Sequence, residues 1–327
     1  MKAVDRIPVL GQKENLMRVF HSIAVALAVL LAGCGGDESG KVAPVAEETT
    51  DMLVVYAVNY PLAYFAERIG GDLVEVVFPA PVDEDPAFWS PDADTIAAYQ
   101  VADLILLNGA GYAKWVDRAT LPSSRLVDTG AAFADRLIEM ESVTTHSHGP
   151  EGEHEHGGWA FTTWLDPTLA IQQAQAVAAA LTALRPEHEQ GIQARMEELE
   201  STLLDLDARL SSAAKIIGDT PLLFSHPVYQ YLIRRYELNG IEVHWEPDEP
   251  PDGHAWDHLE EELESHPAEW MLWEDEPFQS TVADLEDLGI GSLLFDPCAN
   301  APETGDYLTV MEANAGALET IAETRNN

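Results

Sequence analysis

The chain has 327 residues, of which 46% are apolar, and its 57 acidic residues against 17 basic ones give a formal net charge of −40 at pH 7. Such a charge repels the phosphates of nucleic acids and the head groups of anionic lipids, so we expect neither as a partner. The length is sufficient for a large core or for two lobes of ordinary size.

The first informative segment is a short apolar run, residues 23–33, that ends at Cys34. The run follows Arg18, is shorter than the roughly 20 residues of a membrane-spanning helix, and closes in Leu31-Ala-Gly-Cys34, which looks like a bacterial lipoprotein processing site. We therefore predict a signal peptide over residues 1–33, a lipid on Cys34 and a flexible linker over residues 34–50. The folded protein is expected at the periplasmic or extracellular face of a membrane, as an anchored lipoprotein.

Strand and helix patterns alternate from residue 52 onwards. Runs of apolar, often β-branched residues predict buried strands at 52–58, 73–78 and 102–108, and helical spacing of apolar residues predicts helices at 62–69 and 94–100. Buried strands that alternate with helices are typical of a parallel sheet.

Two helices follow, and the second of them is long. An Ala-rich helix is predicted over 167–184, Arg185-Pro186 breaks it, and a second helix runs from 187 to about 215. At about 1.5 Å per residue this helix would span roughly 40 Å, enough to connect two lobes. The strand and helix alternation then resumes, with strands at 221–225, 241–244, 270–273 and 292–295 and helices at 228–236, 256–264, 281–288 and 307–324.

These patterns together predict an α/β fold of two lobes, each a mainly parallel sheet flanked by helices, joined by one long backbone helix, with a ligand cleft between the lobes. The expected domains are an N-terminal lobe at 51–186, a linking helix at 187–216 and a C-terminal lobe at 217–327.

The segment 222–238 contains Ser225-His-Pro-Val-Tyr229 after a buried strand, and it resembles the solute-binding proteins of zinc and manganese ABC transporters, cluster A-I. Further matches follow the family's order along nearly the whole mature chain: Trp164-Leu-Asp-Pro167, Leu272-Trp-Glu274, Phe295-Asp-Pro297 and residues 307–314. The resemblance implies two lobes on a rigid helix, a metal bound between them, and delivery to a membrane permease with its own ATPase.

From this resemblance we expect a monomeric, lipid-anchored solute-binding protein that captures a divalent metal for an ABC importer, with Zn²⁺ as the first cargo and Mn²⁺ as the alternative. Catalysis is not expected, because the sequence has no His-Glu-x-x-His and no Gly-x-Ser-x-Gly motif. It also has no Gly-x-x-x-x-Gly-Lys-Ser/Thr loop, so this chain is not expected to be the ATPase.

Two candidate ligands lie at the ends of predicted strands. His226 and Asp296 each follow a buried strand, which places both at the carboxyl edge of a parallel sheet, where open α/β folds bind ligands. An imidazole and a carboxylate suit Zn²⁺ or Mn²⁺ better than a soft ion such as Cu(I). Glu274, at a third strand end, is expected as a ligand or as a partner that orients one.

Two positions depart from the family pattern. The family's first histidine lies in Asp-Pro-His-x-Tyr/Trp-Glu-Pro, where this chain has Ala87, and its second precedes Trp-Leu-Asp-Pro, where this chain has Thr162. Two protein ligands would hold a divalent ion weakly. An alternative is therefore that the same fold binds a metal complex or a small organic solute, in a pocket lined by Phe88, Trp89 and Trp164.

Other residues are candidates to complete the ligand set. A Gly-rich, acidic segment at 146–156 carries four histidines, resembles the flexible histidine-rich loop of zinc-specific family members, and is predicted to fold over the cleft and donate at least one imidazole. Oxygen ligands from the turn before Ala87, or a thiolate, remain open alternatives. The candidates are His146, His148, His154 and His156 from the loop, Asp83, Glu84 and Asp85 from the turn, and Cys298.

Overall fold

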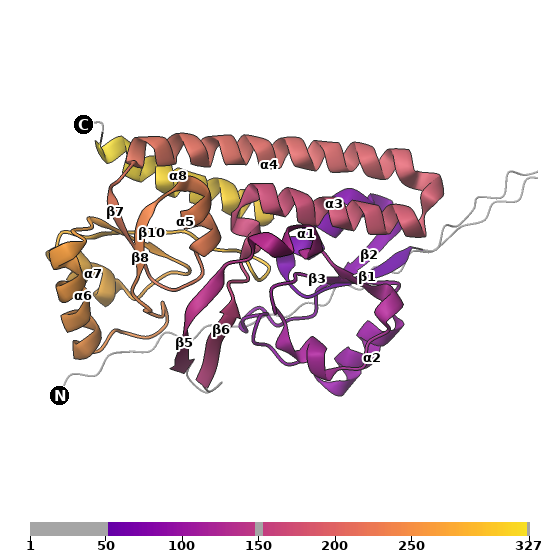
Figure 1. Ribbon diagram of the computed structural model, residues 1–327, viewed down its shortest axis with the longest axis horizontal. Coiled ribbons are helices and arrows are strands. Elements are labelled where there is room, and N and C mark those ends of the chain that lie inside the picture. Colours follow the sequence, from indigo (N-terminus) through magenta and orange to yellow (C-terminus); the bar gives the residue numbers. More distant parts are fainter. Residues whose placement is uncertain (1–51, 148–152, 326–327) are drawn as a thin grey trace, which may run out of the picture. The chain divides into compact units, whose positions relative to one another are not determined.

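In the part of the chain that the computed structural model describes, residues 52–147 and 153–325, two parallel sheets of four strands each are joined by long helices (Figure 1). Side chains are described at 52–140 and 158–325. All these residues belong to one compact unit, Thr49–Asn327. The predicted signal peptide, Cys34, the linker and His148 lie outside the described residues.

The first sheet has the strand order β2-β1-β3-β4. All neighbours are parallel, and Val55 of the central strand β1 lies opposite Val76 on one side and Leu104 on the other. Asn59 caps the following helix by accepting a hydrogen bond from the Leu62 N–H. The elements are β1 (Leu53–Ala57), α1 (Tyr60–Gly70), β2 (Val74–Val77), α2 (Ala93–Val101), β3 (Leu104–Leu107) and β4 (Leu126–Asp128).

The second sheet has the order β10-β9-β7-β8, again with parallel neighbours only. Its two middle strands are the most apolar, since β7 buries Leu222, Leu223 and Phe224 and β9 buries Met271 through Trp273. The elements are β7 (Pro221–Phe224), α5 (Gln230–Tyr236), β8 (Asn239–Glu242), α6 (Gly253–Ser265), β9 (Trp270–Trp273), α7 (Gln279–Asp287) and β10 (Gly291–Leu294).

The chain passes from the first sheet to the second through two long helices, and a third long helix packs against the longer of them. The longest, α4 (Glu189–Ile217), packs against α3 (Pro167–Leu184) of the first lobe and against α8 (Tyr307–Arg325), which closes the second (Figure 1). Its buried residues recur every three or four positions and form one stripe: Ile192, Met196, Leu199, Leu203, Leu206 and Leu210. The predicted α/β fold with two parallel-sheet lobes and a long connecting helix is confirmed.

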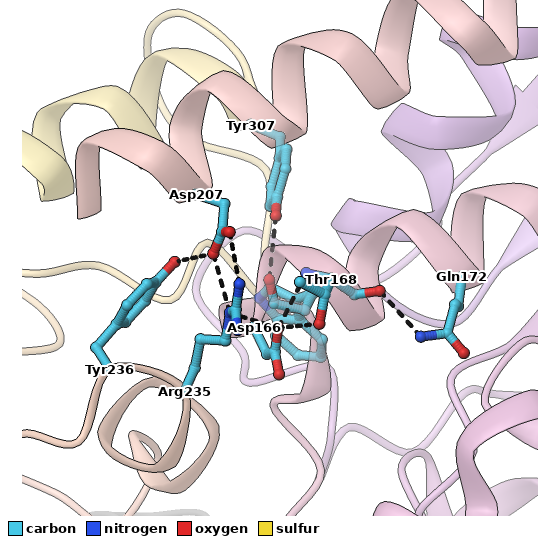
Figure 2. Close-up of polar contacts among 8 residues, drawn as sticks. Asp166, Thr168, Gln172, Asp207, Arg235, Tyr236 and Tyr307 are labelled. Carbon is cyan, nitrogen blue, oxygen red and sulfur yellow. Dashed lines mark hydrogen bonds and ion pairs between the residues drawn. The ribbon is translucent and has the colours of Figure 1, made fainter. Parts of the chain in front are cut away.

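A polar cluster ties the second lobe to the first lobe and to α4 (Figure 2). Arg235 of α5 contacts Asp207 of α4 at 2.6 Å and Asp166, the N-cap of α3, at 3.6 Å. The Tyr236 hydroxyl donates to Asp207 at 2.8 Å. We call these four residues the Arg235 cluster. Because each element contributes a charged or hydroxyl group, the cluster fixes α5 against both helices.

Three histidines of the histidine-rich segment lie in the two strands of an antiparallel hairpin. Strands β5 (Glu139–Ser147) and β6 (Glu153–Trp159) pair with His146 opposite His154 and Thr144 opposite His156. The sequence predicted a loop here, and the structure continues the two strands into the segment because antiparallel pairing satisfies their backbone groups. The side chains of residues 141–157 lie outside the described part, so the donation of an imidazole stays a prediction.

Candidate metal centre

Four acidic or imidazole side chains follow the four strands of the second sheet. His226 comes two residues after β7, Glu246 four after β8, Glu274 directly after β9, and Asp296 two after β10. Because carboxyl ends of parallel strands share one edge of a sheet, all four lie at the edge where α/β folds bind ligands.

Three of these side chains form a close group. His226 Nδ1 lies 2.7 Å from Glu274 Oε1, and His226 Nε2 lies 3.5 Å from Glu246 Oε1. One donor atom from each residue lies within 4.8 Å of the other two, and among the described residues no other such group of three is found. The imidazole is only 4% exposed, against 12% and 20% for the Glu246 and Glu274 side chains.

Burial and charge shift the protonation of this group in opposite directions. Burial lowers the pKa of His226, but the Glu274 carboxylate, by charge and hydrogen bond, and Glu246 raise it to about 9. Burial raises the pKa of Glu246 to about 7, although the imidazole opposes this. At neutral pH the ion-free site therefore favours a protonated imidazole and an only partly ionised Glu246, and a metal cation would replace a proton there.

Asp296 lies at the same edge but outside the group of three. Its Oδ1 accepts a hydrogen bond from the Cys298 N–H at 2.6 Å, and burial raises its pKa to about 6 against that hydrogen bond. It lines the same cleft as His226 and Glu274. The carboxylate is thus positioned by the turn after β10 on the cleft surface.

The cleft has a volume of about 350 Å³ and takes its walls from both lobes. The second lobe contributes five carboxylates, from Glu246, Asp248, Glu274, Asp275 and Asp296. The first lobe contributes the predicted acidic turn, Asp83, Glu84 and Asp85. Asn300 holds this turn against the second lobe, since its side-chain amide donates to the Pro81 and Glu84 carbonyls at 2.6 and 2.9 Å. The charge of Asp85 also contributes to the raised pKa of His226.

The two vacant histidine positions are filled by buried, small side chains. Ala87 is 4% exposed and Thr162 is 3% exposed. The Thr162 hydroxyl donates to the Val228 carbonyl, two residues after His226. Both positions therefore pack the junction of the lobes without a nitrogen donor.

Three other sequence candidates can be placed. Cys298 is buried, and burial raises the pKa of its thiol far above the usual range, which keeps it protonated rather than a thiolate. Trp164 is fully buried, donates from Nε1 to the Pro297 carbonyl at 2.7 Å, and belongs to the core. Phe88 lines the cleft.

Sequence reasoning missed Glu246. The residue follows the predicted strand 241–244 by two positions and lies in the acidic segment Glu246-Pro-Asp-Glu249. That segment reads as an ordinary solvated turn until the sheet edge brings it against His226. The signal that could have identified Glu246 was its position shortly after the end of a predicted strand.

The model of the family described as "zinc-uptake complex component A periplasmic" matches residues 55–321. The chain belongs to this zinc-uptake component A family. Family members are the non-enzymatic solute-binding proteins of metal ABC transporters, which work with a membrane permease and an ATPase. The resemblance inferred from the sequence is thereby confirmed.

The relatives and solved structures that this chain resembles differ in the metal that their names give. The manganese ABC transporter substrate-binding lipoprotein PsaA of Streptococcus pneumoniae is 24% identical over 318 residues, covering 93% of this chain and 97% of that protein. Among solved structures, the metal-dependent lipoprotein YcdH of Bacillus subtilis has a TM-score of 0.70 at 21% identity, covering 83% of this chain and 98% of that one. The Zn(II)-bound ZnuA-like domain of AdcA from Streptococcus pneumoniae has a TM-score of 0.70 at 18% identity, covering 84% and 100%. These structures support the two-lobe fold.

The described residues contain no helix that is both long and apolar enough to cross a membrane.

Proposed function

We propose that this protein captures a divalent metal ion in the cleft between its lobes and delivers it to the permease of an ABC importer. Zinc is the first expected cargo and manganese the second. The observation that carries the proposal is the group of His226, Glu246 and Glu274, whose donor atoms lie within 4.8 Å of one another at the ligand-binding edge of the second sheet.

In this proposal the main metal ligands come from the second lobe. An imidazole and two carboxylates are donors that zinc accepts at about 2.0–2.2 Å, and manganese also accepts such oxygen-rich sets. Asp296 adds a further carboxylate from the same edge. The acidic turn at Asp83, Glu84 and Asp85 approaches from the first lobe, and one of the histidines at 146–156 is a candidate for a further ligand.

The site's negative charge has a second consequence. The cleft collects eight carboxylates and a single imidazole from its described walls. Such a field attracts cations from solution and raises the rate at which they arrive. It also makes a bare anion a poor ligand unless a cation accompanies it.

We further propose that the protein is held to the membrane by a lipid on Cys34, with residues 51–186 and 217–327 as the lobes and 187–216 as the link between them. The lipoprotein names of PsaA and YcdH support this anchorage. Replacing Cys34 by Ser should release the protein or leave it unprocessed. A membrane-bound, lipid-labelled Cys34→Ser chain would contradict the anchor.

The test of the metal function is a titration of the chain that lacks residues 1–34, which leaves the compact unit Thr49–Asn327 whole. Zinc and manganese are titrated separately against a competing chelator. His226→Ala is compared with His258→Ala, which removes an exposed imidazole from α6. We expect His226→Ala to lower the zinc affinity at least about 100-fold, because removing even a group that supports a ligand lowers metal affinity about 10–100-fold. The zinc affinity of His258→Ala should be unchanged. Equal affinities in the two variants would overturn the proposal.

A further inference from the structure

A second cavity, of about 340 Å³, adjoins the metal cleft. The two share three lining residues, Phe88, Phe161 and Val228. The rings of Phe88 and Phe161 meet edge to face with centroids 6.1 Å apart. The boundary between cavity and cleft is therefore apolar.

The cavity differs from the cleft in chemistry. Its apolar wall includes Trp159, which is 45% exposed, and Met140. The charged groups among its described lining residues are Lys114, Asp117 and Arg118, all from one short 3-10 turn, so this described lining carries more positive than negative charge. In a chain with 57 acidic and 17 basic residues, this places two cations beside an aromatic surface. Such a combination suits an anionic group attached to an apolar body.

The backbone on one side of the cavity is held in an unusual conformation. Gly109, Ala110 and Gly111 have φ of 79°, 54° and 72°, and the left-handed conformation is costly for Ala110. A Cβ at Gly111 would meet nothing within 4 Å, so this wall leaves open space in the cavity.

Buried hydrogen bonds fix this turn. The Asn108 side chain accepts from Asn59 at 3.1 Å and from Gln173 at 3.0 Å, and it donates to the Phe161 carbonyl at 2.8 Å. The Asn108 side chain thus connects the strained turn at 109–111 to Phe161, one of the two rings at the boundary with the cleft. A rigid cavity wall is what a preorganised ligand site requires.

We propose that the cavity holds a carboxylate-bearing organic chelator whose donor atoms reach the metal at His226, so that the cargo is a metal–chelate complex; this inference rests on the proposed metal function. Thr162, where the family has a histidine, lines the cavity. Neither Thr162 nor Ala87 supplies a nitrogen donor, and the group of three, His226, Glu246 and Glu274, leaves at least one coordination position of the ion open. A chelator fills those positions, its apolar body packs on Phe88 and Phe161, and a remaining carboxylate faces Lys114 and Arg118.

The volume limits the chelator to a small molecule. Ligand cavities of about 300–1,000 Å³ are usual for organic ligands, and this one lies at the lower end. One ring or a short branched chain with one to three carboxylates fits this description.

The test uses the full chain in detergent and three small carboxylate chelators as probes: picolinate, citrate and histidine. Apparent zinc affinity is measured by calorimetry with each probe present and absent. A probe that only competes for zinc weakens the apparent affinity, whereas a ternary complex strengthens it. We expect at least one probe to strengthen zinc binding tenfold or more.

The cavity's role is isolated by a double variant, Lys114→Ala with Arg118→Ala, compared with Lys215→Ala plus Arg185→Ala, which removes the same charge elsewhere. The first pair should abolish the gain from the chelator and leave binding of zinc alone unchanged, and the second pair should retain the gain. Weakening by all three probes, or equal gains in both double variants, would overturn the chelate proposal while zinc alone still binds. Binding of a probe without zinc would also overturn it, in favour of a free organic anion. Failure of zinc to bind in every form would instead contradict the proposed function.

Discussion

The two lobes present unequal chemistry to the cleft between them. The second lobe brings an imidazole and several carboxylates from four adjacent strand ends, so its donors are grouped by the sheet itself. The first lobe has Ala87 and Thr162 at the two positions where the sequence resemblance predicts histidines, and its charged cleft groups belong to an acidic turn. If the proposed functions hold, the second lobe binds the ion and the first lobe contacts the molecule that accompanies it.

The largest expected effect tests the donor side of this comparison. Glu274→Gln removes the carboxylate that lies 2.7 Å from His226 Nδ1. It should lower the zinc affinity about 100-fold, because both the negative charge of this side chain and its charged hydrogen bond to the imidazole are lost. Glu276→Gln, two residues further in an exposed position, is the matched control. Competition with a fluorescent zinc chelator measures both variants, and similar affinities would show that Glu274 has no part in binding.

Introducing histidines into the first lobe should reduce the difference in metal donors between the two lobes. Ala87→His with Thr162→His introduces the two imidazoles of the family pattern and should tighten binding of zinc alone by about tenfold or more, since it adds nitrogen donors from the first lobe to those of the second. Both sites are buried, so overpacking should cost about 1–3 kcal/mol of unfolding free energy in the ion-free protein. Calorimetry and thermal unfolding measure the two effects. A folded variant without tighter zinc would place the ion away from these positions.

The sequence predicts the two lobes better than it predicts the residues that line the cleft. Strand and helix alternation predicted both lobes and the long helix, because buried parallel strands and a repeating apolar stripe are local signals. It missed β4, whose three residues are too short for a pattern, and the hairpin strands beside the histidines. His226, Glu274 and Asp296 were predicted at one sheet edge from their place after strands. Glu246 and the second cavity depend on contacts between distant segments, which no local pattern encodes.

Acidity should distinguish the ion-free protein from the metal-loaded one. The pKa of His226 is raised from 6.5 to about 9, so its contribution to stability is fully present below pH 6.5 and is lost as the pH rises through 9. The raised pKa of Glu246, from 4.5 to about 7, also makes stability fall as the pH rises between those values. The melting temperature of chelator-treated protein should therefore decrease from pH 5 to 9, and less so in His226→Gln. Zinc affinity should change in the opposite sense, because the ion displaces protons. A flat or rising melting profile would contradict this protonation.

The smallest expected effect concerns the contacts that hold the lobes in place. Asp207→Asn weakens the Arg235 cluster, and the loss should be about 1 kcal/mol because Arg235 is 35% exposed and solvent screens the pair. Glu319→Gln removes the more exposed Arg209 pair on α4 and α8 and should cost less than about 0.5 kcal/mol. Denaturant unfolding measures both. A larger loss in Glu319→Gln would show that the cluster does not fix α5.

The central claim, that the second lobe holds the ion, is tested most directly by anomalous diffraction from crystals of the zinc-loaded protein. We expect one strong zinc peak at the carboxyl edge of the β10-β9-β7-β8 sheet, about 2.0–2.2 Å from ligand atoms of His226 and Glu274. A single peak bound by the histidines of residues 146–156, with His226 and Glu274 still paired to each other, would contradict it.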